Sequence, residues 1–215
     1  MKNLVIPNSV ISIGSYAFDA CTGLTNATFG TGLTSLGTGI FFDCPALATV
    51  TLPNTLTNIG TNAFYNCTNL TSLIIPATVR SIQDYAFLDC TGLKSVYFIG
   101  NAPTADSTVF YNDTVGTAYY LPNTTGWGAT LGGLPTAMWN PQIQTGKSSL
   151  GLRSNQFGFN VTGNPNNPIV IEASTNLFTS GWTLLFNGNV TNGQVYFSDP
   201  SWTNYPKRFY RIRTP

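Results

Sequence analysis

The sequence predicts a mainly β protein in which a solenoid of about five 23-residue coils precedes a small β-sandwich. Three observations predict it: four cysteines recur every 23 residues, apolar residues keep the same interval, and the pattern changes after residue 140. A fixed period in this range indicates one structural unit stacked on copies of itself. The repeated columns are Cys21, Cys44, Cys67 and Cys90; Phe18, Phe41, Phe64, Phe87 and Phe110; Ile13, Leu36, Ile59 and Ile82; and Leu24, Leu47, Leu70 and Leu93.

Each coil is predicted to hold a strand, a second short strand and a turn. The first strand has apolar residues at L-x-x-L-x-L spacing and ends at a proline, as in Leu70, Leu73, Ile75 and Pro76. Proline ends the strand because it has no N–H to donate to a sheet. Val79 and Ile82 predict the second strand. The segment 85–90, YAFLDC, is too short for a stable helix, so we expect one helical or 3₁₀ turn there.

The repeated residues resemble the BspA-type leucine-rich repeats of bacterial cell-surface proteins. The shared pattern is Leu-x-x-hydrophobic-x-hydrophobic-Pro, then Val/Leu-x-x-Ile-Gly, then Ala-Phe-x-x-Cys, and it covers residues 1–98. Residues 99–140 resemble the way such arrays end. The resemblance implies a leucine-rich repeat solenoid with a parallel sheet over 1–140, including a C-terminal cap at 99–140. It also implies an extracellular or cell-surface location.

Both ends of the repeat region depart from the pattern. Met1 stands where leucines such as Leu24 stand in later coils, so the chain begins inside a repeat with no polar cap ahead of it. We therefore expect a C-terminal piece of a longer protein whose export signal lies outside this sequence. At the other end, Asp113 stands where a fifth cysteine would. A carboxylate buried there would lack a partner, so we expect stacking to stop at this point.

Charge is scarce along the whole chain. Charged residues make up 8%, against about a quarter in typical soluble domains, and the net charge is +1. Residues 1–140 hold three basic residues against six aspartates, whereas residues 141–215 hold six basic residues against two acidic ones. This balance does not favour nucleic acid or an anionic membrane as a partner. Because no run of about 18 apolar residues is present, we predict no membrane span.

The cysteine column has three interpretations. Disulfides between neighbouring coils fit the spacing of a solenoid, but parallel stacked side chains rarely meet the dihedral angle that a disulfide requires. A metal site needs convergent thiols, whereas a column diverges along the axis and the chain has no histidine. We favour buried free thiols that pack as small apolar side chains. We therefore predict no metal and no cofactor.

Catalysis has one candidate pair, Asp43 and Asp89, which share a column two coils apart, or about 10 Å. Inverting glycosidases place their two carboxylates about 6.5–9.5 Å apart. We favour solvated turn residues, because no aromatic cleft adjoins the pair. The chain has no histidine and one glutamate, so no nucleophile with a partnered base can be assembled. The prediction is that the protein is not an enzyme.

Solenoids usually bind ligands through the concave face of the strand sheet. Alternation along the strand places Leu73 and Ile75 inward and leaves Ser72 and Ile74 outward. The predicted binding residues on this face are Thr28, Thr51, Ser72, Ile74, Ser95 and Tyr97, with Lys94 beside them. The same residues also suit an ordinary sheet surface, because most have good β-propensity.

Trp127 and Trp139 lie in a glycine-rich segment at the predicted end of the solenoid. Exposed indole rings would stack on sugar rings, whereas buried ones would seal the last apolar layer of the solenoid. We favour the second role, that of a cap.

The segment 140–146 is predicted to be a linker, and residues 141–215 are predicted to form a β-sandwich-like module. Short β runs are predicted at 157–161, 169–174, 182–186, 194–198 and 208–213. Asn-Gly pairs at 187–188 and 192–193 predict a hairpin between the third and fourth runs. The stretches 171–182 and 208–213 resemble a C-terminal β-module of large secreted bacterial proteins. Arg211 and Arg213 either bind an acidic surface or protect an edge strand.

The favoured hypothesis is a non-catalytic extracellular or cell-surface protein that serves in adhesion or recognition of a protein or glycan ligand. The alternative is a structural subunit that assembles head to tail into an extracellular filament or surface layer. An uncapped apolar end is an association site, and here it would comprise Ile6, Val10, Ile13 and Phe18. We favour the simpler explanation that upstream coils cover this end.

Overall fold

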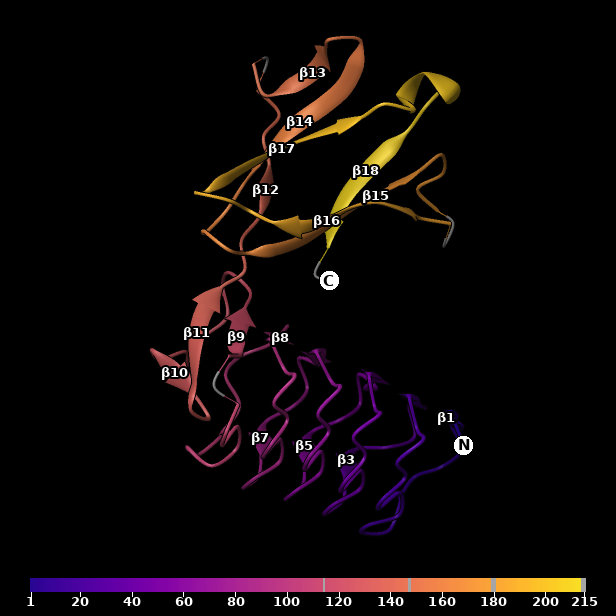
Figure 1. The fold of residues 1–215 in the computed structure, drawn as a ribbon, viewed down its shortest axis with the longest axis vertical. Coiled ribbons are helices and arrows are strands. Elements are labelled where there is room, and N and C mark those ends of the chain that lie inside the picture. The colour runs from indigo at the N-terminus through magenta and orange to yellow at the C-terminus, as the bar shows by residue number, and fades with distance from the viewer. Residues whose placement is uncertain (114, 147, 179–180, 214–215) are drawn as a thin grey trace. The chain divides into compact units, whose positions relative to one another are not determined.

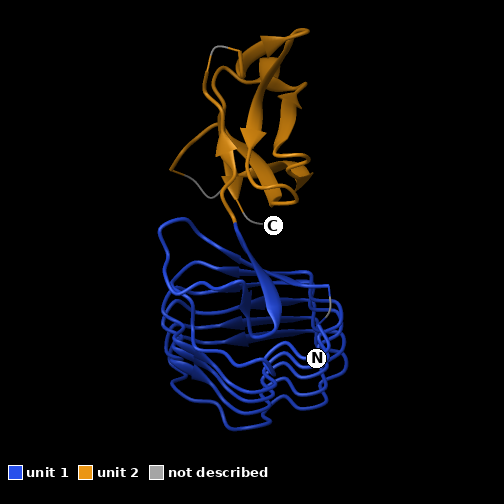
Figure 2. Cartoon of the chain, turned by 90° about the vertical axis from the view of Figure 1, so that its left-hand side faces the viewer, with its two compact units in different colours: residues 1–138 blue, residues 139–215 orange. Residues whose placement is uncertain are grey.

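The computed structural model describes residues 1–113, 115–146, 148–178 and 181–213. The chain forms two compact units, residues 1–138 and 139–215, which Figure 2 colours separately. The first unit is the solenoid and the second is a β-sandwich. The solenoid ends at residue 138, whereas the sequence predicted 140, because Trp139 and Asn140 bond within the second unit. Trp139 Nε1 donates to the Pro168 carbonyl (2.7 Å), and the Asn140 N–H donates to Asn167 Oδ1 (3.1 Å).

The longer strands of the coils form two consecutive sheets (Figure 1). The first sheet, which is parallel, contains β1 (Asn3–Ile6), β2 (Asn26–Phe29) and β4 (Thr49–Thr51). The second contains β6 (Ser72–Ile75), β8 (Ser95–Phe98), β9 (Thr117–Tyr120), β11 (Leu134–Met138) and the antiparallel β10 (Thr130–Leu131). The predicted second short strand is confirmed as a further parallel sheet of β3 (Ser35–Leu36), β5 (Asn58–Ile59) and β7 (Ser81–Ile82).

The apolar columns meet in one continuous core. Inward residues of the strands, such as Leu73 and Ile75, are at most 2% exposed. Phenylalanine rings stack coil upon coil, with centroids 5.1 Å apart between Phe64 and Phe87 and 5.0 Å apart between Phe87 and Phe110. Burying a side chain of this size contributes about 1.5–3 kcal/mol. The column therefore stabilises each coil against its neighbours.

The segment that closes each coil forms turns rather than the predicted helical or 3₁₀ turn. In one coil, for example, two residues of this segment adopt left-handed backbone, Tyr85 (φ 59°) and Asp89 (φ 61°). Left-handed residues interrupt a helical run. The Phe87 N–H therefore donates across to the Val109 carbonyl of the next coil (2.9 Å). The same bond joins Phe18 to Ile40, Phe41 to Ala63 and Phe64 to Ala86.

All four cysteines are free, as predicted. Cys21 is only half-buried, however, because it lies in the first coil, so the prediction of four buried thiols is wrong for this one. Burial raises the pKa of Cys44 to about 12 and raises the pKa of Cys90 as well. Each buried thiol donates to a phenylalanine carbonyl of the preceding coil: Cys44 to Phe18 (3.1 Å), Cys67 to Phe41 (3.4 Å) and Cys90 to Phe64 (2.9 Å).

A hairpin of β10 and β11 follows the last repeated coil. Its turn uses Gly132 (φ 59°) and Gly133 (φ 97°). The Gly132 carbonyl accepts the Phe110 N–H (3.1 Å), and a Cβ on Gly132 would lie 2.8 Å from the Phe110 ring. The turn therefore requires glycine here for both its backbone conformation and its close approach.

Asp113 takes the place of the next cysteine and is 4% exposed. Among the described residues, neither of its carboxylate oxygens has a hydrogen-bond partner. Burial, with a smaller contribution from Asp89, raises the pKa of Asp113 from 3.8 to about 7. The predicted end of stacking at this residue is wrong, because β9 pairs with β8 and β11 with β9 beyond it. The cysteine column stops there, whereas the long-strand sheet continues past it.

The second unit is a sandwich of two sheets around its own core, and the predicted β runs coincide with its strands. One sheet contains β12 (Gln142–Ile143), β13 (Leu150–Arg153), β14 (Gln156–Thr162) and β17 (Gln194–Asp199). The other contains β15 (Pro168–Ser174), β16 (Thr183–Asn189) and β18 (Phe209–Arg213), and a 3₁₀ turn, η1 (Trp202–Asn204), precedes β18. The core comprises Phe159, Val161, Ile169, Ile171, Val190 and Phe197.

Two predictions for this unit are wrong. The supposed linker contains β12, where Gln142 and Ile143 pair with β14. The supposed hairpin is absent, because β16 pairs with β15 whereas β17 pairs with β14 of the other sheet. The Asn192–Gly193 turn does form, with φ of 49° and 83°, and it carries the chain from one sheet to the other.

Thiol labelling without reductant should modify Cys21 first and the other three cysteines only after unfolding, because those three are buried. Cys67→Ser should lower the free energy of unfolding by about 1 kcal/mol, since the hydroxyl keeps the Phe41 carbonyl as an acceptor. Mass spectrometry of the labelled protein and urea unfolding give the two measurements. Equal labelling rates for all four thiols, or a need for reductant, would contradict the assignment.

Asp113→Asn should remove a pH dependence of stability. The folded-state pKa is raised to about 7, so folding takes up a proton and stability falls as pH rises from about 4 to about 7. The variant should match the wild type near pH 4 and exceed it by about 1–3 kcal/mol near pH 8. Urea unfolding at both pH values tests this. A difference that does not change with pH would show that the carboxyl does not titrate in this range.

Candidate functional site

The outer face of the long-strand sheets carries two columns of outward side chains. Their neighbours along the strands, such as Leu4, Ala27 and Leu73, are buried in the core. Adjacent strands lie about 4.8 Å apart, so each column is a close-spaced row along the solenoid. One column comprises Asn3, Asn26, Thr49, Ser72 and Ser95, and the other comprises Val5, Thr28, Thr51, Ile74 and Tyr97.

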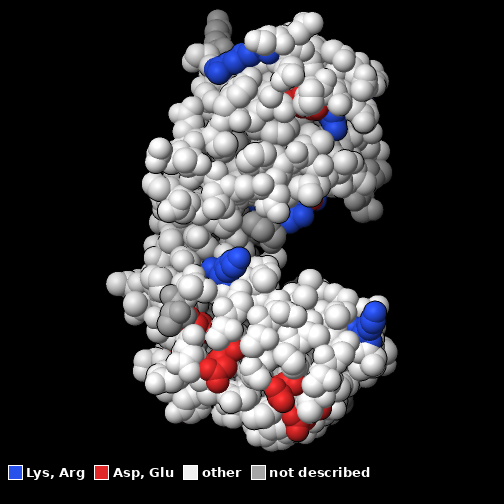
Figure 3. All heavy atoms as spheres, viewed as in Figure 1, with Lys and Arg blue, Asp and Glu red and all other residues white. Residues whose placement is uncertain are grey.

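Hydrogen bonds link the first three residues of the first column. Asn26 Nδ2 donates to Asn3 Oδ1 (2.7 Å), and Thr49 Oγ1 donates to Asn26 Oδ1. These bonds fix side chains that would otherwise rotate freely in solvent. Charged residues are sparse on the solenoid, as the mostly white surface in Figure 3 shows. The two columns therefore present uncharged side chains, and the first three members of the first column are ordered by hydrogen bonds.

Five of the seven predicted binding residues lie in these two columns with accessible side chains, and Lys94 is exposed just before β8. Thr28, Thr51 and Lys94 are exposed, and Ile74 is 43% exposed. Ser72 and Ser95 are half-buried.

Tyr97 differs, because its side chain is only 2% exposed. Its ring stacks on that of Tyr119, with centroids 5.3 Å apart. Burial raises the pKa of both tyrosine hydroxyls. The prediction that Tyr97 lies on the accessible surface is therefore wrong.

The four residues of the predicted association end are half-buried and pack against the core. Their counterparts one coil later are buried: Phe29, Leu33, Leu36 and Phe41 are at most 5% exposed. The first coil has a neighbour on one side only, which accounts for the difference. Association through Ile6, Val10, Ile13 and Phe18 stays a prediction.

The candidate catalytic aspartates are held in a structural column at the turns. Asn66 Nδ2 donates to Asp43 Oδ1 (2.6 Å), and Asn112 Nδ2 donates to Asp89 Oδ1 (2.8 Å). All four residues adopt left-handed backbone, which asparagine and aspartate tolerate better than most residues. No three His, Cys, Asp or Glu side chains gather to hold a metal anywhere in the described part of the chain.

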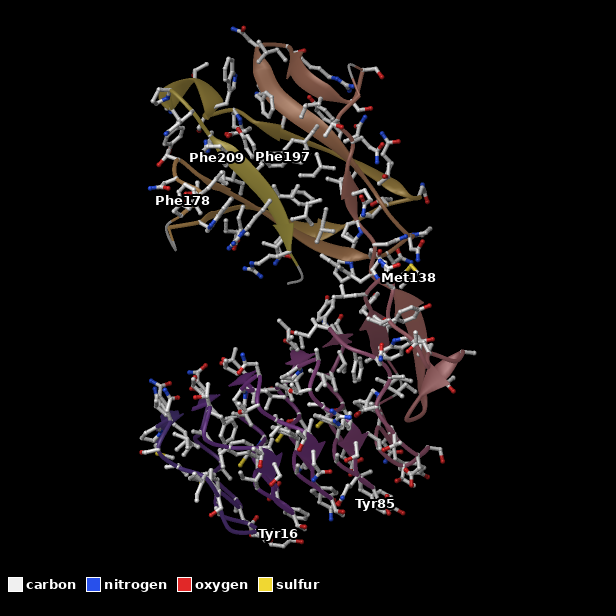
Figure 4. The ribbon with its side chains drawn as sticks, turned by 180° about the vertical axis from the view of Figure 1, so that it is seen from behind. Tyr16, Tyr85, Met138, Phe178, Phe197 and Phe209 are labelled. Carbon is white, nitrogen blue, oxygen red and sulfur yellow. The ribbon has the colours of Figure 1, made fainter. Side chains whose placement is uncertain are left out.

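An aromatic edge lies along the turns, and the sequence analysis missed it. Phe42 and Tyr65 stack with centroids 4.3 Å apart, and Tyr16 packs edge-on against Phe42 (5.9 Å). Tyr16 and Tyr85 are 46% and 41% exposed and lie on the same edge of the solenoid (Figure 4). The signal was present, because Phe42, Tyr65 and Tyr111 share one column of the repeat, in which Leu88 is the exception.

The two tryptophans have different roles. Trp127 packs against the core of the solenoid, stacks on Tyr120 (4.9 Å) and meets Phe98 edge-on (5.1 Å). It therefore caps the last apolar layer, as predicted. Trp139 does not, because it belongs to the second unit, where it bonds to Pro168.

The arginines of β18 are paired within the second unit. Arg211 Nε donates to Glu172 Oε2 (2.8 Å), and Arg213 Nε donates to Glu172 Oε1 (2.7 Å). Burial opposes ionisation of Glu172, but its hydrogen bonds and ion pairs with the two arginines outweigh burial and lower the pKa. The Arg211 guanidinium also lies over the Trp182 ring (4.2 Å). Because β18 is an edge strand, this arrangement fits the protective role rather than a free basic surface.

The repeats can be assigned to a family. Residues 1–115, more than half of the 215, match the family described as BspA type leucine rich repeat region, with six copies of the repeat. The chain belongs to the BspA-type leucine-rich repeat family. A comparison with curated proteins finds no match.

Solved structures of similar proteins share the leucine-rich repeat fold of this BspA-type chain. A leucine rich cell surface protein from Faecalibacterium prausnitzii is 29% identical, with a TM-score of 0.52, over 56% of this chain and 32% of that one. A leucine-rich repeat protein from Bacteroides ovatus is 21% identical, with a TM-score of 0.51, over 64% of this chain and 36% of that one. The second likeness shows the fold alone. The matches span about a third of each relative's length.

Among the residues that the structure describes, this BspA-type chain has no helix that is long and apolar enough to cross a membrane.

Glu172→Gln should lower the free energy of unfolding of this BspA-type protein by about 1–3 kcal/mol at pH 7, because two charge-assisted hydrogen bonds are weakened. The folded-state pKa of Glu172 is lowered, so its contribution is present above the unfolded pKa and is lost as pH falls through the folded one. The difference between variant and wild type should therefore shrink in acid. Thermal unfolding at several pH values measures it, and a difference that grows in acid would refute it.

Proposed function

We propose that this protein is a non-catalytic recognition module of a bacterial cell surface, which binds a protein or glycan ligand through the outer face of its solenoid sheets. The observation that carries the proposal is the uncharged pair of columns on the outer face, on which Thr28, Thr51 and Ile74 are exposed at one-coil intervals. Membership of the BspA-type family and the cell-surface relative from Faecalibacterium prausnitzii support the location.

The composition of the face supports binding of a ligand with many polar groups and little charge. Threonine, serine and asparagine supply donors and acceptors in a fixed row, and Ile74 adds an apolar contact. Because hydrogen bonds along the column already order some of these side chains, less conformational entropy is lost on binding. Lys94 adds one positive charge beside the row.

The turn geometry supports a role without catalysis. Asp43 and Asp89 each accept a hydrogen bond from the asparagine of the next coil. Both aspartates therefore have a structural role that accounts for their position.

Screening the protein against immobilised glycans and surface proteins should find reproducible ligands. Thr51→Lys and Ile74→Lys should each weaken binding at least about tenfold, because a long charged side chain would project from the uncharged face. Gln83→Lys is the matched control, since Gln83 is exposed next to β7, in a different sheet. Its affinity should equal that of the wild type.

Two results would overturn the proposal. Binding that survives both substitutions unchanged would place the site elsewhere. Turnover of any substrate that is lost in Asp43→Asn or Asp89→Asn would show that the protein is an enzyme.

A further inference from the structure

The second unit holds a cavity of about 250 Å³ whose walls are mainly aromatic. Its lining residues come from β14 and from η1 through to the start of β18. Figure 1 draws η1 and β18 in yellow and β14 in orange. Its walls include Trp202, Tyr205, Pro206, Lys207, Arg208 and Tyr210. A second cavity of about 360 Å³ shares Tyr205 and Arg208 with the first. Arg208 therefore stands between two hollows of the same unit.

Arg208 is a buried cation with spare hydrogen-bond donors. Its side chain is 9% exposed, and its NH1 lies 2.7 Å from Asp199 Oδ2. The two charges are paired at this distance, but the NH1 group forms no hydrogen bond of good geometry. Asp199 is its only ion-pair partner within the described ranges, and a guanidinium carries five N–H donors. NH1 itself is enclosed, so the donors left for a ligand are those of Nε and NH2, which have no hydrogen-bond partner among the described residues.

The surroundings hold this guanidinium in place. It lies over the Tyr205 ring, with its carbon 4.2 Å from the ring centroid. Asp199 is fixed in turn, because its Oδ2 accepts the Tyr210 hydroxyl (2.8 Å) and its Oδ1 accepts the Ser201 N–H (3.0 Å). Burial, and then the bond to Asp199, raise the pKa of Tyr210, so this hydroxyl remains a donor over the physiological range. The cation is preorganised before any ligand arrives.

The walls suit a ring with an apolar face. Tyr205 is 40% exposed, and Trp202 is half-buried with its Nε1 donating to the Asn155 carbonyl (3.1 Å). Tyr210 and Phe157 stack with centroids 5.3 Å apart. Aromatic rings that are fixed at one edge and open at another offer surfaces on which the C–H face of a sugar packs. The volume is close to the lower end of the range for small-molecule sites, about 300 Å³.

We propose that the paired cavities around Arg208 bind an acidic glycan, with the carboxylate of a uronic-acid residue on the Arg208 guanidinium and its ring against Tyr205 and Trp202. This site lies in the second unit and goes beyond the recognition face of the solenoid.

Charge and polarity favour this ligand. Arg208 and Lys207 outweigh Asp199, so the lining has one net positive charge for one carboxylate. A planar guanidinium pairs well with a planar carboxylate through parallel hydrogen bonds. In the second cavity, Thr183, Ser198 and Ser201 supply hydroxyl groups that match the hydroxyls of a neighbouring sugar. An apolar acid would leave those hydroxyls without partners.

Isothermal titration of the whole protein with oligogalacturonate of defined length tests the proposal. Binding should saturate at one site per chain. The methyl-esterified form of the same oligosaccharide should bind at least about tenfold more weakly, because it keeps the rings but has no carboxylate charge. Absence of oligogalacturonate binding, or equal affinity for the ester, would overturn the assignment.

A matched pair of variants locates the site. Tyr205 and Tyr196 are 40% and 38% exposed, and each lies under an arginine, Arg208 at 4.2 Å and Arg153 at 4.7 Å. Tyr205→Ala should weaken oligogalacturonate binding at least about tenfold, whereas Tyr196→Ala should leave it unchanged. Circular dichroism and thermal unfolding check that both variants are folded. Equal effects of the two substitutions would refute the location.

Arg208→Lys keeps the charge beside Asp199 but removes the planar fork, so it should weaken binding of the acid while leaving affinity for the ester unchanged. Ile74→Lys, on the solenoid face, should not alter oligogalacturonate binding. The two proposals can therefore fail separately. If Arg208→Lys binds the acid as well as the wild type does, the guanidinium does not hold the carboxylate.

Discussion

The hydrogen bond that each turn donates to the next coil is the constraint on which the solenoid depends. Left-handed residues such as Tyr85 and Asp89 interrupt any helical run, so the Phe87 N–H between them bonds to the Val109 carbonyl of the next coil. This bond holds neighbouring coils in a strict one-repeat register. The same register stacks the phenylalanine rings and brings each buried thiol to a carbonyl of the preceding coil. The straight rows on the outer face follow from it.

The column of asparagine and aspartate residues at the turns supports this register with hydrogen bonds rather than with ion pairs. Asparagine and aspartate tolerate left-handed backbone, and their side chains bond to one another between coils, as Asn66 does to Asp43. An aspartate pair that resembles a catalytic dyad in the sequence is therefore part of the scaffold. Asp113 is the exception, because it is buried beside the last coil with no partner among the residues described. Its raised pKa reflects that isolation.

The second unit, unlike the solenoid, buries acidic side chains that are paired with arginines. Glu172 and Asp199 are 6% and 2% exposed, and each is paired with arginine from the last strand or the residue before it. The Glu172 pairs connect an edge strand to the centre of its sheet, whereas the Asp199 pair leaves guanidinium donors beside an aromatic cavity. The two units therefore offer different chemistry, an uncharged face on the solenoid and a cationic aromatic cavity in the sandwich.

The sequence by itself determined the period, the core columns, the free thiols, the five main strands of the sandwich and the family, because each depends on residues that repeat or alternate along the chain. It also placed Thr28, Thr51 and Ile74 on the accessible face, since alternation fixes the direction of a strand side chain. Only the tertiary structure decided that Tyr97 is buried, that β16 and β17 belong to different sheets and that Arg208 stands between two cavities. These features depend on residues far apart in the chain that pack together, and no local pattern records which segments meet.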